Sequence, residues 1–287
     1  MMPEQSPEDA EAIRHLINNR PEEDYCGLTF NEMRRLSFET FEADSPLQIN
    51  PSISDQALDS LPFFRLTEEF LKIIQRDGYV KLTPLGALPK KILTGLYSHR
   101  FILEEAIEKE IHKLTREVDS PALSALHNNT VLSGLIRKAN GKLFLTKVGS
   151  KLLTTKDRNK IFMRALYAYT DKLPWSNLDG YPALPVGNLG WGFSILMLLQ
   201  EGDTPRAASY YAAKYLKAFP EFHHTYPLRE YSTPERDLLR IYCLRTFDRF
   251  LEWWGFVKAD RPISWLERDL TLFTAAPALK EIFQFDS

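Results

Sequence analysis

The chain has 287 residues, of which 44% are hydrophobic and 26% are charged, and its net charge is −2. This composition is typical of a soluble globular protein and excludes disordered and fibrous chains. The two cysteines, Cys26 and Cys243, exclude a disulfide framework and a cysteine metal site. No apolar run is long enough to cross a membrane, and the acidic N-terminus does not resemble a signal peptide. We therefore expect a cytoplasmic protein with no membrane partner, long enough for two domains.

Charge is distributed unevenly along the chain. Residues 1–60 hold 13 acidic and 4 basic side chains, a balance of −9, whereas residues 61–287 have a balance of +7. We expect residues 1–60 to form an acidic N-terminal helical segment. Between residues 131 and 160, eight bases face a single acid. A local excess of positive charge of this size can attract a polyanion. A helix face that is simply exposed to solvent would give the same run of basic residues.

A nonapeptide occurs twice, at Gly78–Gly86 and at Gly141–Gly149, with the shared pattern Gly-x-apolar-x-Leu-Thr-x-apolar-Gly. The alternation before each threonine is typical of a short strand, and the spacing after it is helical. We therefore expect strands 79–83 and 142–146 to lie side by side in one small sheet. Two separate copies of a half-domain are the alternative.

The threonine of each copy is placed to cap the following helix. Thr83, followed by Pro84, should begin a helix over 85–97, and Thr146 should begin another. The last glycine of each copy, Gly86 or Gly149, would let its helix approach the strand closely. Backbone N–H groups beside these glycines could instead hold a phosphate, but a lone glycine pattern is a weak signal for this.

The segment between the two copies predicts a charged helix over 99–118 and then a helix-turn-helix. Its helices would start at Ser120 and Asn129, and the second, 130–139, would show small polar and basic side chains to solvent. With helix 66–76 and the two strands, this order predicts a winged-helix-like domain over 61–173. We expect nucleic acid to be contacted by Thr130, Ser133, Arg137, Lys138, Lys142, Lys147 and Lys151.

The second half predicts the same plan. Residues 174–192 hold three prolines and four glycines and should form a connector. Beyond it we expect helices over 191–200, 204–219 and 233–254, and a hairpin that pairs 255–258 with 269–274 and has Trp265 in its tip. A short helix near 278–285 would close this second winged-helix-like domain, 193–287. Acids balance the bases on its third helix, including Arg240 and Arg245, which suits protein contact better than phosphate contact. The fold class is therefore mostly α with small β-sheets (α+β).

The sequence holds no recognised catalytic motif, so we expect no catalytic residue, no metal and no cofactor. Glu104, Glu108 and His112 recur every fourth residue and could hold a metal, but a solvated helix face with acid–base pairing is the favoured interpretation. The adjacent His223 and His224 lie in an aromatic segment without a nucleophile to serve.

Several short motifs together resemble a known group of proteins. They are "GLTFNEMRRLSFETF" at 27–41, "VKLTPLGALPKKIL" at 80–93, "LIRKANGKLFLTKVGSKLL" at 135–153 and "LPWSNLDGYP" at 173–182. In this order they resemble a family of uncharacterised bacterial proteins, some of them encoded on plasmids and mobile elements. The resemblance covers residues 25–220 and implies that the acidic segment is an integral, helix-containing cap. It carries over no catalytic residue and no ligand.

Two hypotheses of function follow, with an enzyme in third place. In the first, a non-enzymatic winged-helix protein contacts nucleic acid through its basic residues. In the second, the protein is an interaction or adaptor module, and the acidic segment covers the basic surface. The position of residues 1–60 discriminates between them.

Overall fold

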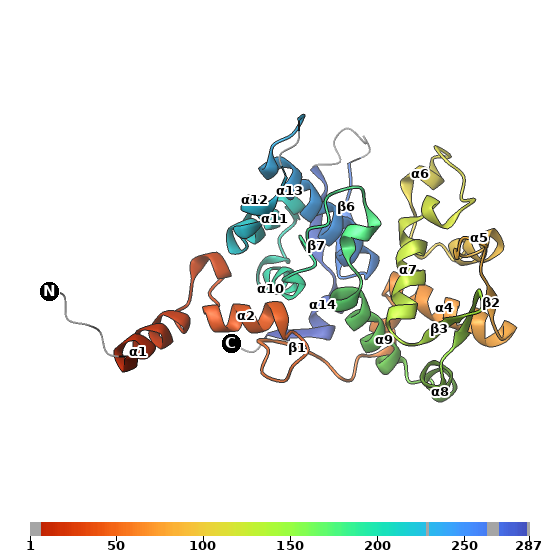
Figure 1. Ribbon diagram of the computed structural model, residues 1–287, viewed down its shortest axis with the longest axis horizontal. Coiled ribbons are helices and arrows are strands. Elements are labelled where there is room, and N and C mark those ends of the chain that lie inside the picture. Colours follow the sequence, from red (N-terminus) through yellow and green to blue (C-terminus); the bar gives the residue numbers. More distant parts are fainter. Residues whose placement is uncertain (1–6, 228–229, 263–269, 286–287) are drawn as a thin grey trace.

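A computed structural model describes residues 7–227, 230–262 and 270–285 (Figure 1). Within these ranges the chain is mainly helical, with three small antiparallel sheets of two or three strands. The predicted α+β fold class is therefore confirmed. The predicted hairpin tip with Trp265 lies outside the described residues.

The N-terminal segment packs against the second half of the chain. A capping box between Thr29 and Glu32 starts the second helix, which contacts helix α10. The first strand pairs antiparallel with the last, so that Leu47 lies opposite Phe285. The elements are α1 (Pro7–Asn18), η1 (Glu23–Tyr25), α2 (Phe30–Phe38), β1 (Leu47–Ile49) and α3 (Asp55–Asp59), with β8 (Phe283–Phe285) at the other end of the chain.

The first half begins with a long helix and builds a three-stranded sheet in the order β2-β4-β3. Val80 lies opposite Leu143, which confirms that the two copies of the nonapeptide are neighbouring strands. The elements are α4 (Pro62–Asp77), β2 (Val80–Lys81), α5 (Lys90–Tyr97), α6 (Glu105–Glu108), η2 (Glu117–Asp119), α7 (Pro121–Leu132), β3 (Ile136–Ala139), β4 (Lys142–Leu145), α8 (Lys147–Thr155) and α9 (Arg158–Tyr167).

The predicted helix over 130–139 is wrong. One helix, α7, runs from Pro121 to Leu132 and replaces the expected helix pair. Gly134 follows with φ +71°, a left-handed conformation that ends the helix, and the chain continues as strand β3. The following residues satisfy their backbone groups by pairing with β4, with Ile136 opposite Leu145.

Four other helices also differ from the prediction; two of them lie in the second half, where α11 begins at Ala208 after strand β5 and α14 ends at Ile282 before strand β8. The only α-helix in residues 99–118 is the four-residue α6, because Arg100 and Glu110 adopt positive φ values of 57° and 55° on either side of it. The helix expected over 85–97 begins at Lys90, because Gly86 has φ +80° and the Thr83 hydroxyl accepts the Ala87 N–H in a turn.

The second copy of the nonapeptide behaves as predicted. Its threonine, Thr146, accepts the N–H of Gly149 at 3.0 Å and so caps helix α8. A Cβ atom built on Gly149 would lie 2.1 Å from the backbone oxygen of Leu135. Only a glycine lets α8 approach Leu135, the residue before strand β3, so closely.

The second half repeats the element order of the first, and its sheet has the matching strand order β5-β7-β6. Val257 lies opposite Ala275, which confirms the predicted hairpin outside its tip. The third helix continues into a π-helical segment. The elements are α10 (Trp191–Glu201), β5 (Arg206–Ala207), α11 (Ala208–Ala218), α12 (Glu221–Thr225), α13 (Pro234–Tyr242), η5 (Cys243–Leu251), β6 (Val257–Asp260), β7 (Leu272–Ala275) and α14 (Pro277–Ile282).

The two halves share one cluster of buried apolar side chains. At its centre the Trp254 ring lies 5.2 Å from that of Phe63 and 5.5 Å from that of Tyr169. Tyr169 belongs to η3 (Ala168–Lys172), which leads into the connector and its helix η4 (Trp175–Leu178). The connector is fixed by Arg245, whose Nε donates to Asp179 at 2.7 Å.

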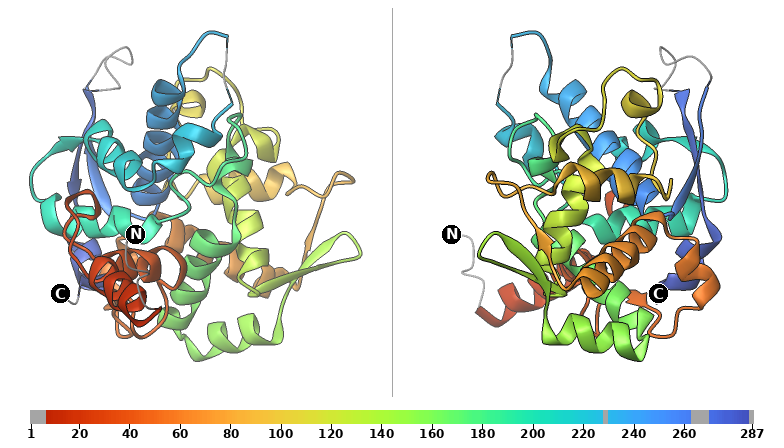
Figure 2. Two further views of the ribbon diagram at one scale, coloured as in Figure 1. Left: turned by 60° about the vertical axis from the view of Figure 1, so that its left-hand side comes forward. Right: turned by 90° about the vertical axis from the view of Figure 1, so that its right-hand side faces the viewer.

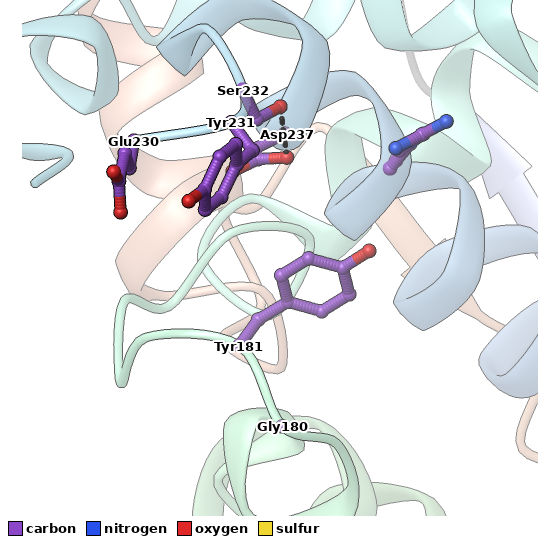
Figure 3. A pocket seen from close by; sticks show the side chains of 7 residues that line it. Gly180, Tyr181, Glu230, Tyr231, Ser232 and Asp237 are labelled. Carbon is purple, nitrogen blue, oxygen red and sulfur yellow. Dashed lines mark hydrogen bonds between the residues drawn. The ribbon is translucent and has the colours of Figure 1, made fainter. Parts of the chain in front are cut away.

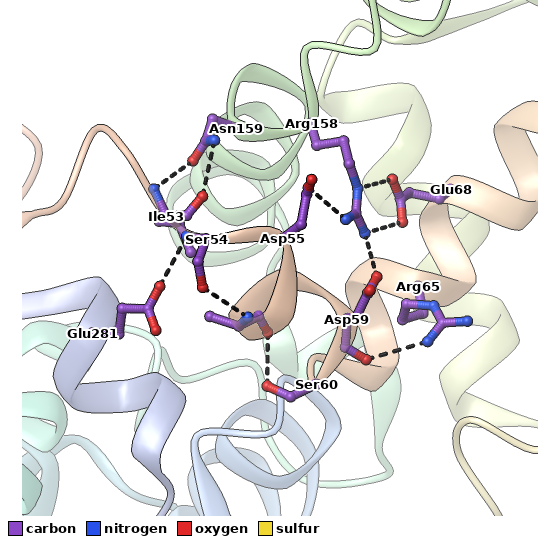
Figure 4. A network of polar contacts seen from close by, with 11 residues as sticks. Ile53, Ser54, Asp55, Asp59, Ser60, Arg65, Glu68, Arg158, Asn159 and Glu281 are labelled. Atoms are coloured by element: carbon purple, nitrogen blue, oxygen red, sulfur yellow. Dashed lines mark hydrogen bonds and ion pairs between the residues drawn. The ribbon is translucent and has the colours of Figure 1, made fainter.

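A polar network joins α3, α4 and α9 (Figure 4). Arg158 donates to Glu68 from Nε at 2.8 Å, and also to Asp55 and Asp59 at 2.7 and 2.8 Å. The neighbouring Asn159 exchanges two hydrogen bonds with the backbone of Ile53. These contacts hold the end of the acidic segment against the first half of the molecule.

Candidate nucleic-acid interface

The structure separates the seven predicted contact residues into two groups. Thr130 and Ser133 are buried, and their hydroxyls donate to the backbone oxygens of Leu126 at 2.6 Å and Thr130 at 2.7 Å. The expectation that they lie on an exposed helix face is therefore wrong. The other five lie at the surface: Arg137 and Lys138 on β3, Lys142 on β4, and Lys147 and Lys151 on α8.

Helix α7 holds the position in which a recognition helix would be expected, but it lies inside the protein. Asn128 is its only exposed residue. The buried Asn129 donates from its side chain to the backbone oxygen of Ala165 in α9. In the third helix of the second half, the side chain of Arg245 in η5 is 0% exposed, whereas Arg236 and Arg240 in α13 are exposed. The predicted exposed polar arc around Arg245 is wrong for this residue.

The eight basic residues between positions 131 and 160 differ in whether a carboxylate neutralises them. Arg158 and Lys160 form ion pairs. Six others form none with any described residue: Arg137, Lys138, Lys142, Lys147, Lys151 and Lys156. We call these six the basic surface. Their positive charge acts on the solvent rather than on a carboxylate partner.

The β3–β4 hairpin carries part of this surface away from the body of the protein, as both views of Figure 2 show. Successive residues of β3 point to opposite faces of the sheet. Lys138 lies over the turn at Gly86, where an added Cβ would be 2.8 Å from its Nζ. Arg137 lies on the other face, with its guanidinium carbon 5.1 Å from the centre of the Phe144 ring.

Two aromatic rings lie among the cations of that face, and the sequence analysis missed them. The Phe144 and Tyr79 ring centres are 5.8 Å apart, and the Nζ atom of Lys142 lies 3.9 Å from the centre of the Tyr79 ring. Lys81 pairs with Lys142 in the sheet and therefore shares this face. The alternation of apolar and polar residues in the two copies of the nonapeptide could have predicted that these rings lie on the same face as the cations.

The described part of the acidic segment, residues 7–60, does not cover the basic surface. In Figure 1, α1 lies at one end of the long axis and α2 in the same half of the molecule, whereas β2, β3 and α8 lie in the other half. The segment instead contacts α10 and α11, through α2 and η1 respectively, and its last helix, α3, contacts α4 and α9. The covering contact expected in the adaptor hypothesis is thus not formed.

The other candidate groups do not assemble a reactive site. Glu104 accepts the Ala122 N–H, Glu108 pairs with Arg100, and His112 contacts the backbone oxygen of Asp119. No three metal-ligating side chains gather anywhere in the described ranges. His223 and His224 both lie on the short helix α12.

A hollow of about 480 Å³ lies beside the connector (Figure 3). Asp237 in its wall accepts hydrogen bonds from the hydroxyls of Tyr226 at 2.9 Å and Ser232 at 2.7 Å. This carboxylate is thereby engaged in holding the wall together. The lining is formed by Gly180, Tyr181, Glu230, Tyr231, Ser232, Asp237 and Arg240.

Comparison with known proteins finds one family. Residues 59–159 match the model of the Y4jL N-terminal domain, which bears out the resemblance to an uncharacterised family over this part of the chain. The match includes both copies of the nonapeptide and the whole basic surface. No curated protein and no solved structure matches the chain. Among the described helices, none has the length and apolar character needed to cross a bilayer.

Proposed function

We propose that this protein binds nucleic acid through the basic surface, with its lysines and Arg137 contacting phosphates. The observation that carries the proposal is that six cations gather on one hairpin and the adjoining helix without a carboxylate partner among the described residues. Phosphate neutralisation releases condensed counterions and supplies most of the sequence-independent affinity of such proteins.

In this proposal the two halves are winged-helix-like domains, 61–173 and 193–287, joined by the connector 174–192 and preceded by the helical segment 1–60. Their support is the repeated order of helix, strand, three α-helices and hairpin, with the first strand beside the last in both sheets. The β3–β4 hairpin is then the wing of the first domain. We place the protein in the cytoplasm, where its two free cysteines would stay reduced.

The proposed contact differs from that of a helix inserted into the major groove. Because α7 is buried, its side chains cannot reach base edges without unfolding the core. The charged side chains of the β3–β4 hairpin and of α8 are all cations, which bind phosphates without reading sequence. We therefore expect binding that depends strongly on salt and little on base sequence.

Burial of α7, and of Arg245 in the η5 part of the corresponding helix of the second half, favours a second candidate function, that of a protein-interaction module. A winged-helix-like domain whose recognition helix is buried can act as a scaffold for protein contacts as well as a nucleic-acid-binding domain. In that case the basic surface would meet an acidic protein instead. A direct binding experiment separates the two functions.

The proposal is tested by reversing the charge of the wing. Arg137→Glu together with Lys138→Glu should weaken binding of a labelled oligonucleotide roughly 10- to 100-fold at about 50 mM salt, since two phosphate contacts become repulsive. Fluorescence anisotropy measures this. Both side chains are exposed, so the fold should be retained.

The matched control is Arg236→Glu with Arg240→Glu on α13, which makes the same change in net charge at two exposed positions of the second half. Arg245 is unsuitable as a control because it is buried against Asp179. The control variant should bind as the unmodified protein does. If single-stranded and duplex oligonucleotides both fail to bind the unmodified protein, the protein-interaction function replaces this proposal.

A further inference from the structure

The surface that the first half offers to a nucleic acid is a sheet face rather than a helix. Strands β2, β4 and β3 lie side by side, and their inward residues, such as Val80 and Leu143, are buried. Their outward residues are Tyr79, Lys81, Lys142, Phe144 and Arg137. The face therefore combines three cations with two aromatic rings and has no acidic side chain on these strands.

The rings are near enough to each other to act together. Their centres lie 5.8 Å apart, with an angle of 44° between the ring planes. Tyr79 is 41% exposed, and Phe144 is half-buried. Each ring has a cation beside it, Lys142 at 3.9 Å from Tyr79 and Arg137 at 5.1 Å from Phe144. The side chains that would stack on bases and those that would hold phosphates are thus neighbours.

This arrangement distinguishes between classes of nucleic acid. In a duplex the base faces are already stacked on one another, so exposed rings add little to binding. In a single strand the base faces are free, and stacking on an aromatic side chain adds roughly 5- to 100-fold in affinity for each base. Cations interspersed with rings are the combination used for single strands, since they follow the phosphates between the stacked bases.

We infer that the ligand of the basic surface is a single-stranded nucleic acid whose bases stack on Tyr79 and Phe144. This inference rests on the proposed function and names its ligand class. It assigns the two aromatic residues to affinity and preference for single strands. The six cations of the basic surface supply the salt-dependent part of the binding.

A second aromatic–lysine pair elsewhere in the chain provides a matched comparison. Tyr167 on α9 is 42% exposed, and the Nζ atom of Lys172 lies 5.0 Å from its ring centre. Its other neighbour is Phe41, at 5.1 Å between ring centres, so it belongs to the packing of the acidic segment. An exposed ring beside a lysine is common on protein surfaces, and Tyr167 measures what such a ring contributes by itself.

The experiment compares a labelled 20-nucleotide oligothymidylate with a 20-base-pair duplex at the same salt concentration, using the full chain. The unmodified protein should bind the single strand at least about 10-fold more tightly than the duplex. Tyr79→Leu together with Phe144→Leu should weaken single-strand binding roughly 10- to 100-fold and leave duplex binding unchanged. Leucine keeps apolar volume at both sites, and the melting temperature checks that the fold is retained.

Two further variants show whether the rings themselves are responsible. Tyr79→Phe keeps the ring and should retain single-strand binding, while Tyr167→Leu should bind as the unmodified protein does. This inference would be overturned if the unmodified protein bound the duplex as tightly as the single strand or more tightly, and if Tyr79→Leu with Phe144→Leu did not change either affinity. The proposed function would still stand in that case. Absence of binding to both oligonucleotides would overturn the proposed function itself.

Discussion

Two arginines show how burial determines what a charge does in this protein. Arg245 is fully buried, and its guanidinium donates to both oxygens of Asp179 and to the backbone oxygens of Pro182 and Leu184. A buried charge needs such complete pairing, because water no longer solvates it. Arg137 is exposed and has no carboxylate partner among the described residues. Only the second kind of arginine is free to exchange water for a phosphate.

Two helical glycines give a residue-scale prediction with an internal control. Gly149→Ala should destabilise the fold by about 2–3 kcal/mol, because the new methyl group would overlap the backbone oxygen of Leu135. Gly95→Ala in α5 makes the same chemical change with no atom within 4 Å, and should stabilise the helix by about 0.5–1 kcal/mol. Urea unfolding of the two variants measures both effects. Equal stabilities would contradict the close approach of α8 to Leu135.

At the scale of elements, the start of α7 depends on a partly buried carboxylate. Ser120 caps this helix through the N–H of Leu123, and Pro121 occupies its first position. Glu104 accepts the N–H of Ala122 at 3.1 Å, while its second oxygen is buried without a hydrogen-bond partner among the described residues. Burial raises the pKa of the Glu104 carboxyl above its ordinary value, and the contacts with Ser120 and Ala122 offset part of this rise.

This raised pKa predicts a pH-dependent stability. Because the folded pKa of Glu104 exceeds the unfolded one, the unfolded state loses this proton first, and the contribution to stability falls as pH rises from the unfolded toward the folded pKa. Glu104→Gln keeps an oxygen for Ala122 and removes the charge. Its melting temperature relative to the unmodified protein should therefore rise between pH 4 and pH 8. Glu108→Gln, at an exposed carboxylate, is the control, and a Glu104→Gln difference that does not change with pH would contradict this account.

Local sequence patterns predicted some elements well and others poorly. The repeated nonapeptide identified β2 and β4 as neighbours, because alternation, turn glycines and a capping threonine all act within a few residues. The helix over 130–139 failed because Leu135, Ile136 and Ala139 fit a helical spacing as well as a strand, and pairing with β4 decides between the two. Tertiary contacts therefore determine that these residues form a strand, a choice that the local periodicity leaves open.

The candidate site was predictable in its charges but not in its shape. Five of the seven predicted contact residues lie at the surface, because lysine and arginine are rarely buried without a partner. The burial of Thr130 and Ser133 depends on the packing of α7 against distant helices, which no local pattern contains. Tyr79 and Phe144 meet only because the sheet register brings two distant segments together.

For the molecule as a whole, the net charge of −2 conceals a separation of charge in space. Helices α1 and α2 lie in one half of the molecule along its long axis, and the basic surface lies in the other (Figure 1). A protein with this distribution would approach a polyanion with its basic end first. The acidic end would remain directed away from the polymer. This orientation leaves α1 and α2 accessible while the wing is bound.

The central claim, that the basic surface contacts phosphates, is tested most directly by the dependence of oligothymidylate affinity on salt. Six phosphate contacts predict that the logarithm of the association constant falls by about 4 for each unit of the logarithm of salt concentration. Arg137→Glu with Lys138→Glu should make this slope shallower by about 1.4, whereas Arg236→Glu with Arg240→Glu should not change it. A slope near zero, or the same slope in the wing variant and the unmodified protein, would contradict the claim.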